Sequence, residues 1–343
     1  MAETSKARNS LSLERFVRLV LLNKEVTRSK IAEQTGFSPA SITQKSKWLD
    51  KHGLIRKVTV RKKHSKRPVE ALSLSCLPWV TLAVHIRASD VTVQVINSTS
   101  EQLALFHQKV SRPTQRSVFT AIGKSVTKAQ GWIQSKDQRL TGIGLEVDGI
   151  VSDNNAALIY SLNGIDEWLP CSPKFMHPQL IDITVIGQWT QVASKLHGLA
   201  KQLGTDNNIA YVERYKRDLH LAVMHNGIIK LGRMGTSGPF LHQSVRKSGG
   251  QCYCGNTSCL DALLRAGKAS DEMLFTALDA QIHKHGIKNL GLERIHKQSH
   301  FTYENKQLTT LVFPKDGEQL NRDGSALLVT EAMLLNHMHD LNS

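Results

Sequence analysis

The sequence has few of the features that place a protein in a membrane or outside the cell. No apolar run approaches the roughly 20 residues that a transmembrane helix requires, and the N-terminus lacks the charged-then-apolar order of a secretory signal. Only 5 of the 343 residues are cysteine, and three of these are clustered, which does not suit a disulfide framework. We therefore expect a cytoplasmic protein that is long enough for two or three domains with cores of their own.

Acidic residues are also scarce, since 29 of them stand against 44 lysines and arginines, a net charge of +15. The excess is concentrated in residues 1–80, which hold 17 basic and 6 acidic residues, a net charge of +11. The remaining 263 residues hold 27 and 23, a net charge of +4. A basic first quarter on a nearly neutral body indicates a polyanionic partner, and for a small domain that partner is usually nucleic acid.

The N-terminal region begins with two predicted helices. Apolar residues recur at helical spacing over residues 11–22, whereas residues 1–10 are polar and read as a frayed tail. A second, short helix starts after Thr27, which can cap it, and stops at Gly36, where a C-cap glycine is expected.

A third helix follows at once. Ser38 and Pro39 supply a capping serine and a proline at the first helical position, and Gly53 ends the helix. In a helix-turn-helix the N-terminal half of this last helix enters the major groove of DNA. Gln can bind adenine bidentately, Ser and Thr reach bases or phosphate, and Lys supplies charge. The contacts predicted on this helix are Ser38, Ser41, Thr43, Gln44, Lys45 and Lys47.

A basic hairpin comes next. Residues 54–60 alternate like a strand, and residues 69–74 form its predicted partner. An arginine at the tip of such a hairpin can enter a narrow A/T-rich minor groove, where the potential is most negative. Residues 1–77 are therefore predicted to be a winged helix-turn-helix domain that binds double-stranded DNA. The contacts predicted on its wing are Arg61, Lys62, Lys63, Lys66 and Arg67.

The composition changes after Pro78, where strand and helix patterns alternate. Residues 80–96 indicate a β-hairpin, and residues 102–110 a further strand. An amphipathic helix is predicted over residues 117–135, and a buried strand over residues 140–147. This order is typical of an α/β domain.

The most specific chemical signal lies in residues 242–259. Three cysteines fall within eight residues, and a histidine stands ten positions before the first of them. Tetrahedral zinc accepts one imidazole and three thiolates, and four protein ligands indicate a structural rather than a catalytic ion. The alternative is a loop of reduced thiols. The predicted ligands of one Zn²⁺ per chain are His242, Cys252, Cys254 and Cys259, whereas Cys76 and Cys171 are expected to be small buried hydrophobes.

This ligand spacing, followed by Leu260-Asp261, resembles the zinc signature of the ROK family of repressors and sugar kinases. Gly324-Ser325-Ala326-Leu327-Leu328 resembles the family's Gly-Ala-Ala-Leu helix, and Lys66-Arg67-Pro68 its Gly-Arg-Pro wing. The resemblance implies an α/β protein, in which an N-terminal winged helix-turn-helix is followed by a two-lobed actin-like ATPase (ROK) fold. The lobes would be residues 78–190 and residues 191–343, the second with the zinc site and the dimerisation surface.

The same resemblance argues against kinase activity, because the family's phosphate-binding residues are replaced. Its hairpin motif Asp-x-Gly-x-Thr corresponds here to His85, Arg87 and Ser89. Its second glycine-rich loop corresponds to Asp218, His220 and Ala222. Phosphate binding needs backbone close to the phosphate oxygens, which glycine permits, and an aspartate facing a triphosphate would repel it.

The family's catalytic and sugar-holding carboxylates are missing as well. Its base, in the motif Glu-Asn-Asp, corresponds to Gln188, and glutamine cannot take a proton from a sugar hydroxyl at neutral pH. The sugar-holding glutamate corresponds to Pro239. The carboxylates of Glu146, Asp148 and Asp153 are interpreted as solvated loop charges. We therefore predict no catalytic residue and no enzyme activity.

The sequence thus predicts a sequence-specific DNA-binding transcriptional regulator, a repressor of carbohydrate-related or other metabolic genes, with a catalytically inactive sensor body. It would be a homodimer or a dimer of dimers, since a two-fold protein matches a palindromic operator. The alternative is a conventional sugar-responsive repressor whose rebuilt pocket uses Asn163, Asp166 and Gln188. The effector, a small molecule or a protein, is left open, and no membrane partner is expected.

Overall fold

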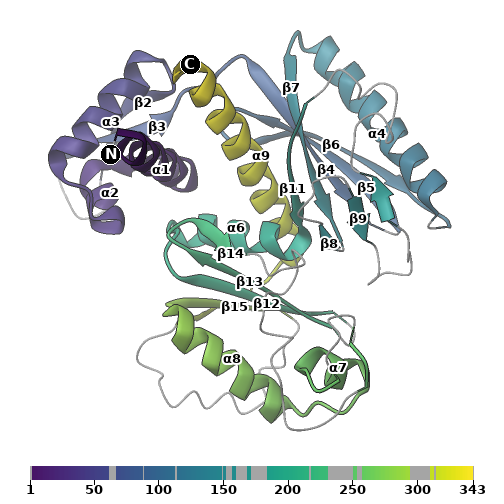
Figure 1. Ribbon diagram of the computed structural model, residues 1–343. Coiled ribbons are helices and arrows are strands. Elements are labelled where there is room, and N and C mark those ends of the chain that lie inside the picture. Colours follow the sequence, from purple (N-terminus) through teal and green to yellow (C-terminus); the bar gives the residue numbers. More distant parts are fainter. Residues whose placement is uncertain are drawn as a thin grey trace.

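The structure is a computed structural model of the chain. It contains an N-terminal helical domain and two larger α/β lobes (Figure 1). Among the helices it describes, none is long and apolar enough to cross a membrane. The described residues are 2–61, 67–87, 89–112, 114–148, 150–151, 157–159, 168–170, 184–215, 218–230, 250–252, 257–293, 310–312 and 314–342.

Three helices open the chain: α1 (Ala2–Asn23), α2 (Arg28–Thr35) and α3 (Pro39–Lys51). The expectation of a frayed tail over residues 1–10 is wrong, because α1 begins at Ala2. That segment includes alanine, glutamate, lysine and arginine, which are good helix formers. The helix therefore does not need an apolar stripe there.

The caps that the sequence predicts are confirmed. The Thr27 hydroxyl accepts a hydrogen bond from the Lys30 amide at the start of α2, and Gly36 ends α2 at φ 71° in the left-handed region. Ser38 caps α3 in the same way, with Pro39 at its first position.

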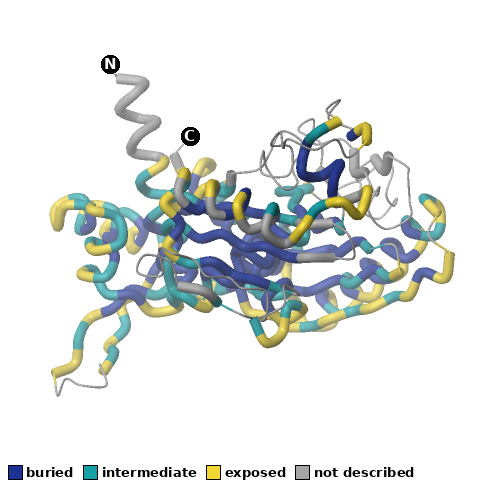
Figure 2. The backbone as a smooth tube through the Cα atoms, turned by 90° about the horizontal axis from the view of Figure 1, so that it is seen from below, coloured by how far each residue is buried: buried dark blue, intermediate teal, exposed yellow. Residues whose placement is uncertain are grey.

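An antiparallel hairpin of β2 (Ile55–Arg61) and β3 (Pro68–Leu74) follows, and β1 (Val26–Thr27) pairs with the other edge of β3. The hairpin projects from the body (Figure 2). The predicted order of three helices followed by a hairpin is therefore present.

The first lobe is a five-stranded sheet with the order β11-β7-β4-β5-β6. The hairpin and the further strand predicted after Pro78 are confirmed as the antiparallel β4, β5 and β6, while β7 and β11 run parallel to β4. The helix α4 covers one face through Val118, Ile122 and Val126. The elements are β4 (Trp79–Ile86), β5 (Asp90–Asn97), β6 (Gln102–Lys109), α4 (Gln115–Ser135), β7 (Arg139–Val147) and β11 (Val185–Thr190).

The second lobe has a five-stranded sheet with the order β14-β13-β12-β15-β16. One face packs against α7 and α8, and the other against α6. A third, small sheet consists of β8 (Ile150–Val151), β9 (Ala157–Ile159) and β10 (Trp168–Pro170), and β8 contacts β11 of the first lobe. The elements of the lobe are α6 (Gln191–Leu203), β12 (Ile209–Tyr215), β13 (Asp218–His225), β14 (Ile228–Lys230), α7 (Leu260–Arg265), α8 (Asp271–His285), β15 (Asn289–Glu293) and β16 (Thr310–Val312).

The last helix, α9 (Gly317–Asn342), connects all three parts. Its Ala326 and Val329 pack on the first-lobe sheet, and it also contacts α1. It meets α6 backbone to backbone, because a Cβ at Gly324 would overlap the carbonyl oxygen of Ser194, and one at Gly198 that of Leu320. The two helices can approach this closely only because both positions are glycine.

One apolar core runs from the N-terminal domain into the second lobe. It includes Phe16 of α1, Leu49 of α3, Leu199 of α6, Tyr211 of β12 and Leu334 of α9, all at most 1% exposed. The N-terminal domain is therefore packed against the body and is not held by a tether alone.

The α6–α9 contact predicts opposite outcomes for the same substitution at two helical glycines. Gly324→Ala should lower the free energy of unfolding by about 3 kcal/mol or more, since the helices must separate. Gly131→Ala, in α4 where a Cβ meets nothing within 4 Å, should raise it by about 0.5–1 kcal/mol. Urea unfolding of the two variants measures both, and equal effects would contradict the close contact.

Candidate functional site

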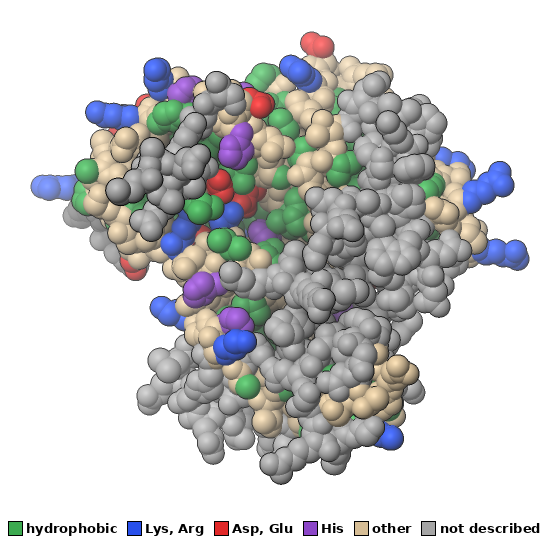
Figure 3. All heavy atoms as spheres, viewed as in Figure 1, with side chains coloured by type: hydrophobic (Ala, Val, Ile, Leu, Met, Phe, Trp, Pro, Cys, Tyr) green, Lys and Arg blue, Asp and Glu red, His purple; other side chains and the backbone are tan. Residues whose placement is uncertain are grey.

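The exposed face of α3 carries several of the predicted DNA contacts. Gln44 and Lys47 are exposed, and Ser38 is exposed at the N-cap. The opposite face buries Ile42 and Leu49, so packing fixes which side of the helix is presented to solvent. Lys and Arg side chains project from this part of the molecule (Figure 3).

The other predicted contacts on α3, Ser41, Thr43 and Lys45, form hydrogen bonds within the helix. The Thr43 hydroxyl donates to the Pro39 carbonyl at 2.9 Å, and the Lys45 ammonium donates to the Ser41 hydroxyl at 2.8 Å. Partial burial lowers the pKa of Lys45, which lies 5.1 Å from the centroid of the Phe37 ring. Gln44 and Lys47 are thus the predicted contacts on α3 whose polar ends lie most open to DNA.

On the wing, Arg61 ends β2 opposite Pro68, Arg67 comes directly before β3, and both arginines are exposed. The other predicted wing contacts, Lys62, Lys63 and Lys66, lie outside the described residues. The hairpin lies beside α3, since β2 contacts that helix.

In the body, the interpretation of Glu146 as a solvated loop charge is wrong. It lies on β7 and is 2% exposed, and its Oε1 is 3.0 Å from Nδ1 of His85 on β4. Asn321 of α9 donates to Oε1 at 2.9 Å, and the Ser325 hydroxyl donates to Oε2. The sequence hides this pair because the parallel register that places His85 opposite Glu146 is a tertiary feature.

Each partner of this pair favours the charged form of the other, as the directions of their pKa shifts show. Burial alone would raise the pKa of Glu146, but the charge of His85 and three hydrogen bonds lower it from 4.5 to about 2. Burial would likewise lower the pKa of His85, yet Glu146 and the Gln94 side chain raise it above 6.5. His85 Nε2 donates to Gln94 Oε1 at 2.7 Å, so both ring nitrogens have polar neighbours.

All three side chains at the family's phosphate-binding positions are occupied by protein contacts. Beyond His85, the Arg87 guanidinium donates to Glu318 of α9 at 3.0 Å, and the Ser89 hydroxyl donates to Asp90 at 2.7 Å. The residues of the second predicted loop position, including the buried Ala222, lie on the extended strand β13. This arrangement leaves no glycine-lined backbone cradle at either described position.

The predicted sugar pocket is described only in part. Gln188 is half-buried on β11 beside β7, while Asn163 and Asp166 lie outside the described residues, as do Asp153 and Pro239. Next to Gln188, the Trp189 ring covers Gly144 and Gly187, where a Cβ would overlap it. The Trp189 ring therefore lies on the sheet next to Gln188, the residue that corresponds to the catalytic base of ROK kinases.

Two of the four predicted zinc ligands, Cys252 and Cys259, lie in one buried cluster with Ala262. Cys252 donates to Asp261 at 3.0 Å, and Cys259 accepts from the Ala262 amide at 3.4 Å. His242 and Cys254 lie outside the described residues, among which no three metal-binding side chains come together. Two buried sulfurs side by side fit the donor set of a structural zinc. Cys76, expected to be buried, is exposed, because it lies in the connection after β3, and Cys171 is not described.

Sequence reasoning also missed a buried lysine. Lys195 of α6 is 1% exposed and lies 2.8 Å from both Glu213 of β12 and Glu293 of β15. The Tyr211 hydroxyl donates to Glu293 at 2.5 Å. A lysine in an amphipathic helix reads as a solvent-facing residue, and only the packing of α6 on the sheet reveals otherwise.

Comparison with known proteins agrees with this geometry. Residues 216–302 match the model of the ROK family. The DNA-binding transcriptional dual regulator NagC of Escherichia coli (strain K12) is 23% identical over 240 residues, which cover 69% of this chain and 58% of NagC. The xylose repressor of Bacillus subtilis (strain 168) is 23% identical over 280 residues, 77% of this chain and 67% of that protein.

Solved structures share the fold. A ROK family transcriptional regulator, a homolog of the E. coli Mlc protein, matches with a TM-score of 0.63 at 17% identity, covering 96% of this chain and 98% of that one. The chain is similar to ROK proteins in sequence over part of its length and in fold over nearly all of it. The ROK hexokinase from Thermus thermophilus has a TM-score of 0.54 at 14% identity and covers 72% of this chain and 97% of its own. The predicted α/β fold of two actin-like lobes is therefore confirmed. The matched part of the chain spans 58% of the length of NagC.

The His85–Glu146 pair predicts a pH-dependent stability. The lowered pKa of Glu146 contributes stability above pH 4.5 that is lost as the pH falls toward 2. The raised pKa of His85 contributes below pH 6.5 and is lost as the pH rises through its folded value. His85→Gln should therefore lower the free energy of unfolding most between pH 4.5 and pH 6.5, by about 3–5 kcal/mol.

Urea unfolding of wild type and His85→Gln across this pH range measures the difference. The control is His107→Gln, whose ring is half-exposed and 3.7 Å from Asp90, and it should cost under about 1 kcal/mol throughout. A loss in His85→Gln that is the same at pH 5 and above the folded pKa would show that the pair is not ionised.

Proposed function

We propose that this protein is a sequence-specific DNA-binding transcriptional repressor whose body senses an effector and does not phosphorylate sugars. The observation that carries the proposal is the exposed polar face of α3, with Gln44 and Lys47, in a region of net charge +11. The names of the relatives, a dual regulator, a xylose repressor and an N-acetylglucosamine repressor, support the same role.

The contacts within the body favour the function of a sensor over that of a kinase. The buried His85–Glu146 pair and the Arg87–Glu318 pair take up the side chains that a phosphate-binding hairpin would present to ATP. Gln188 at the position of the base cannot accept a proton. Phosphoryl transfer depends on positioning and on charge stabilisation around the phosphate, and these replacements provide neither.

The names of the relatives also favour a carbohydrate as the effector. Of the three residues predicted for its pocket, Gln188 is the one that the structure describes. A homodimer, or a dimer of dimers, would present two copies of α3 to a palindromic site. A structural Zn²⁺ on His242, Cys252, Cys254 and Cys259 would order the second lobe and supply no catalytic chemistry, since its four ligands close the coordination shell.

For DNA, two neighbouring substitutions on α3 should have different effects. Gln44→Ala removes a bidentate base contact, so discrimination at one base pair should relax by about 1–3 kcal/mol while the salt dependence stays unchanged. Lys47→Ala removes a phosphate contact, so affinity should fall for all sequences and the salt slope by about 0.9.

Selection of binding sites from random duplexes with wild type and both variants tests this prediction. Equal, sequence-independent weakening by both variants would show that α3 does not read bases. Failure of the wild type to enrich any sequence would overturn the proposed function itself.

For the metal, purified protein should contain about one equivalent of zinc per chain by elemental analysis. Cys259→Ser should lose the metal and lower the melting temperature, because a buried ligand is removed. Cys76→Ser is the matched control, since Cys76 is exposed and outside the ligand set, and it should keep both. A stable wild type without metal would contradict the site.

A further inference from the structure

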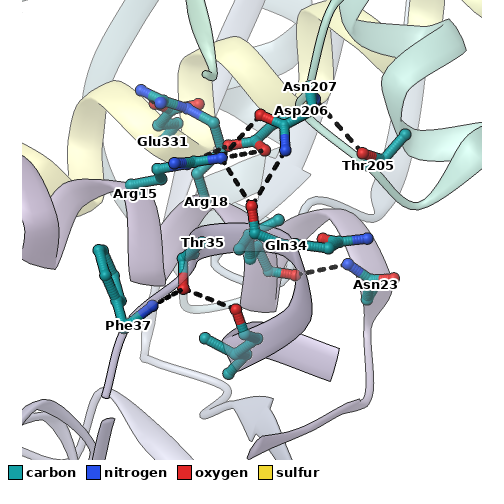
Figure 4. Close-up of polar contacts among 12 residues, drawn as sticks. Arg15, Arg18, Asn23, Gln34, Thr35, Phe37, Thr205, Asp206, Asn207 and Glu331 are labelled. Atoms are coloured by element: carbon teal, nitrogen blue, oxygen red, sulfur yellow. Dashed lines mark hydrogen bonds and ion pairs between the residues drawn. The ribbon is translucent and has the colours of Figure 1, made fainter. Parts of the chain in front are cut away.

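The last turn of α2, which leads into α3, is bonded to the second lobe. The carbonyl of Gln34, near the end of α2, accepts hydrogen bonds from Arg15 Nη2 at 3.0 Å and Asn207 Nδ2 at 3.0 Å. The Gln34 side chain donates to the carbonyl of Gly204 at 2.9 Å. Gly204 and Asn207 belong to the turn between α6 and β12, and Figure 4 shows this turn facing α2. Residues far apart in sequence therefore hold the end of α2 that leads into α3.

Ion pairs hold the same junction. Arg15 Nε is 3.3 Å from Asp206 Oδ2, and Arg15 Nη2 donates to Asn207 Oδ1 at 2.7 Å. One helical turn along α1, Arg18 Nε donates to Glu331 of α9 at 2.7 Å. We call this set the clamp: Arg15, Arg18, Gln34, Asp206, Asn207 and Glu331 (Figure 4).

The clamp is largely shielded from water, which makes its geometry specific. The side chains of Asp206 and Glu331 are 0% and 9% exposed, and those of Arg15 and Arg18 are 16% and 13% exposed. Removing one partner would leave a buried charge without compensation, so the clamp resists small displacements. Around it, the shared apolar core of α1, α6 and α9 excludes solvent.

The helix α6 connects the clamp to the proposed effector pocket. It begins at Gln191, directly after the strand that carries Gln188, and ends at Leu203, next to the clamp turn. A helix of this length spans about 20 Å. Because its backbone is in contact with α9 at Gly198 and Gly324, α6 cannot bend independently of α9. A displacement of the Gln188 end of α6 would therefore reach the clamp residues outside the N-terminal domain. These are Asp206 and Asn207 in the turn after α6, and Glu331 on α9.

We infer that the clamp positions the DNA-reading helix: Arg15, Asp206, Asn207 and Gln34 set the angle of α3 without touching DNA, and α6 transmits the state of the body to it. The inference rests on the proposed function and adds how DNA binding would be regulated. It requires that the clamp residues act on sequence-specific binding and not only on stability.

The test uses the full chain and two duplexes, one selected by the wild type from a random pool and one unselected duplex of equal length. Arg15→Gln and Asn207→Ala should each weaken binding to the selected duplex by about 10-fold, the scale of substitutions that alter coupling. Binding to the unselected duplex should stay the same. Lys24→Gln is the control for lost charge, because its pair with Glu101, at 3.9 Å, is exposed, and it should change neither.

Hydrogen exchange gives a readout that does not involve DNA. The amides of Gly36 and Phe37, which are bonded to the Ala32 carbonyl and the Thr35 hydroxyl, should exchange about 10-fold faster in the clamp variants and unchanged in Lys24→Gln. The double substitution of Arg15→Gln with Asp206→Asn should raise these exchange rates little more than Arg15→Gln alone if both residues act through one contact. If Asp206→Asn does not fold, the half-buried Asn207→Ala carries the test.

The outcomes separate the two proposals. Clamp variants with wild-type exchange at the α2–α3 turn and wild-type affinity for the selected duplex would overturn the inference. A proportional loss on both duplexes, with a lower melting temperature, would also overturn it, because it would show a structural role only. If the wild type selects no sequence, the proposed function fails, and the exchange rates alone decide whether the clamp fixes the turn.

Discussion

The structure depends on the contact between α6 and α9, two helices whose backbones touch at Gly198 and Gly324. One helix covers the second-lobe sheet, and the other packs on the first-lobe sheet and on α1. With ordinary side chains at these positions the helices would stand farther apart, and the core shared by three parts of the molecule would open. The relative positions of the lobes and of the N-terminal domain follow from this contact.

Around that contact, buried charges are arranged in pairs that join different elements. His85–Glu146 links two strands to α9, Lys195 links α6 to the second-lobe sheet, and Arg18–Glu331 links α1 to α9. Such pairs contribute little net stability compared with apolar residues, but each is costly to break and therefore favours one arrangement of its elements. The side chains at the positions that resemble a kinase's phosphate-binding hairpin, His85 and Arg87, form ion pairs within the protein.

The sequence predicted most local features, because they depend on neighbouring residues. The caps at Thr27, Ser38 and Gly36, the hairpin after α3 and the α/β order after Pro78 all follow from short-range propensity and periodicity. The family resemblance, carried by spaced cysteines and glycines, gave the two-lobed fold. The polar start of α1 was the local exception, since helix formers were mistaken for a tail.

What the sequence by itself determined is the kind of each element and the side chains each can offer: a basic helix with Gln44, a cluster of one histidine and three cysteines, and a glutamine at position 188. Only the tertiary structure decided which charges meet. Glu146 became one half of a buried pair because parallel strands placed His85 opposite it. Arg15 reached Asp206, 191 positions away, because a shared core brought their helix and turn together. Such encounters depend on register and packing, which residues distant in sequence fix jointly.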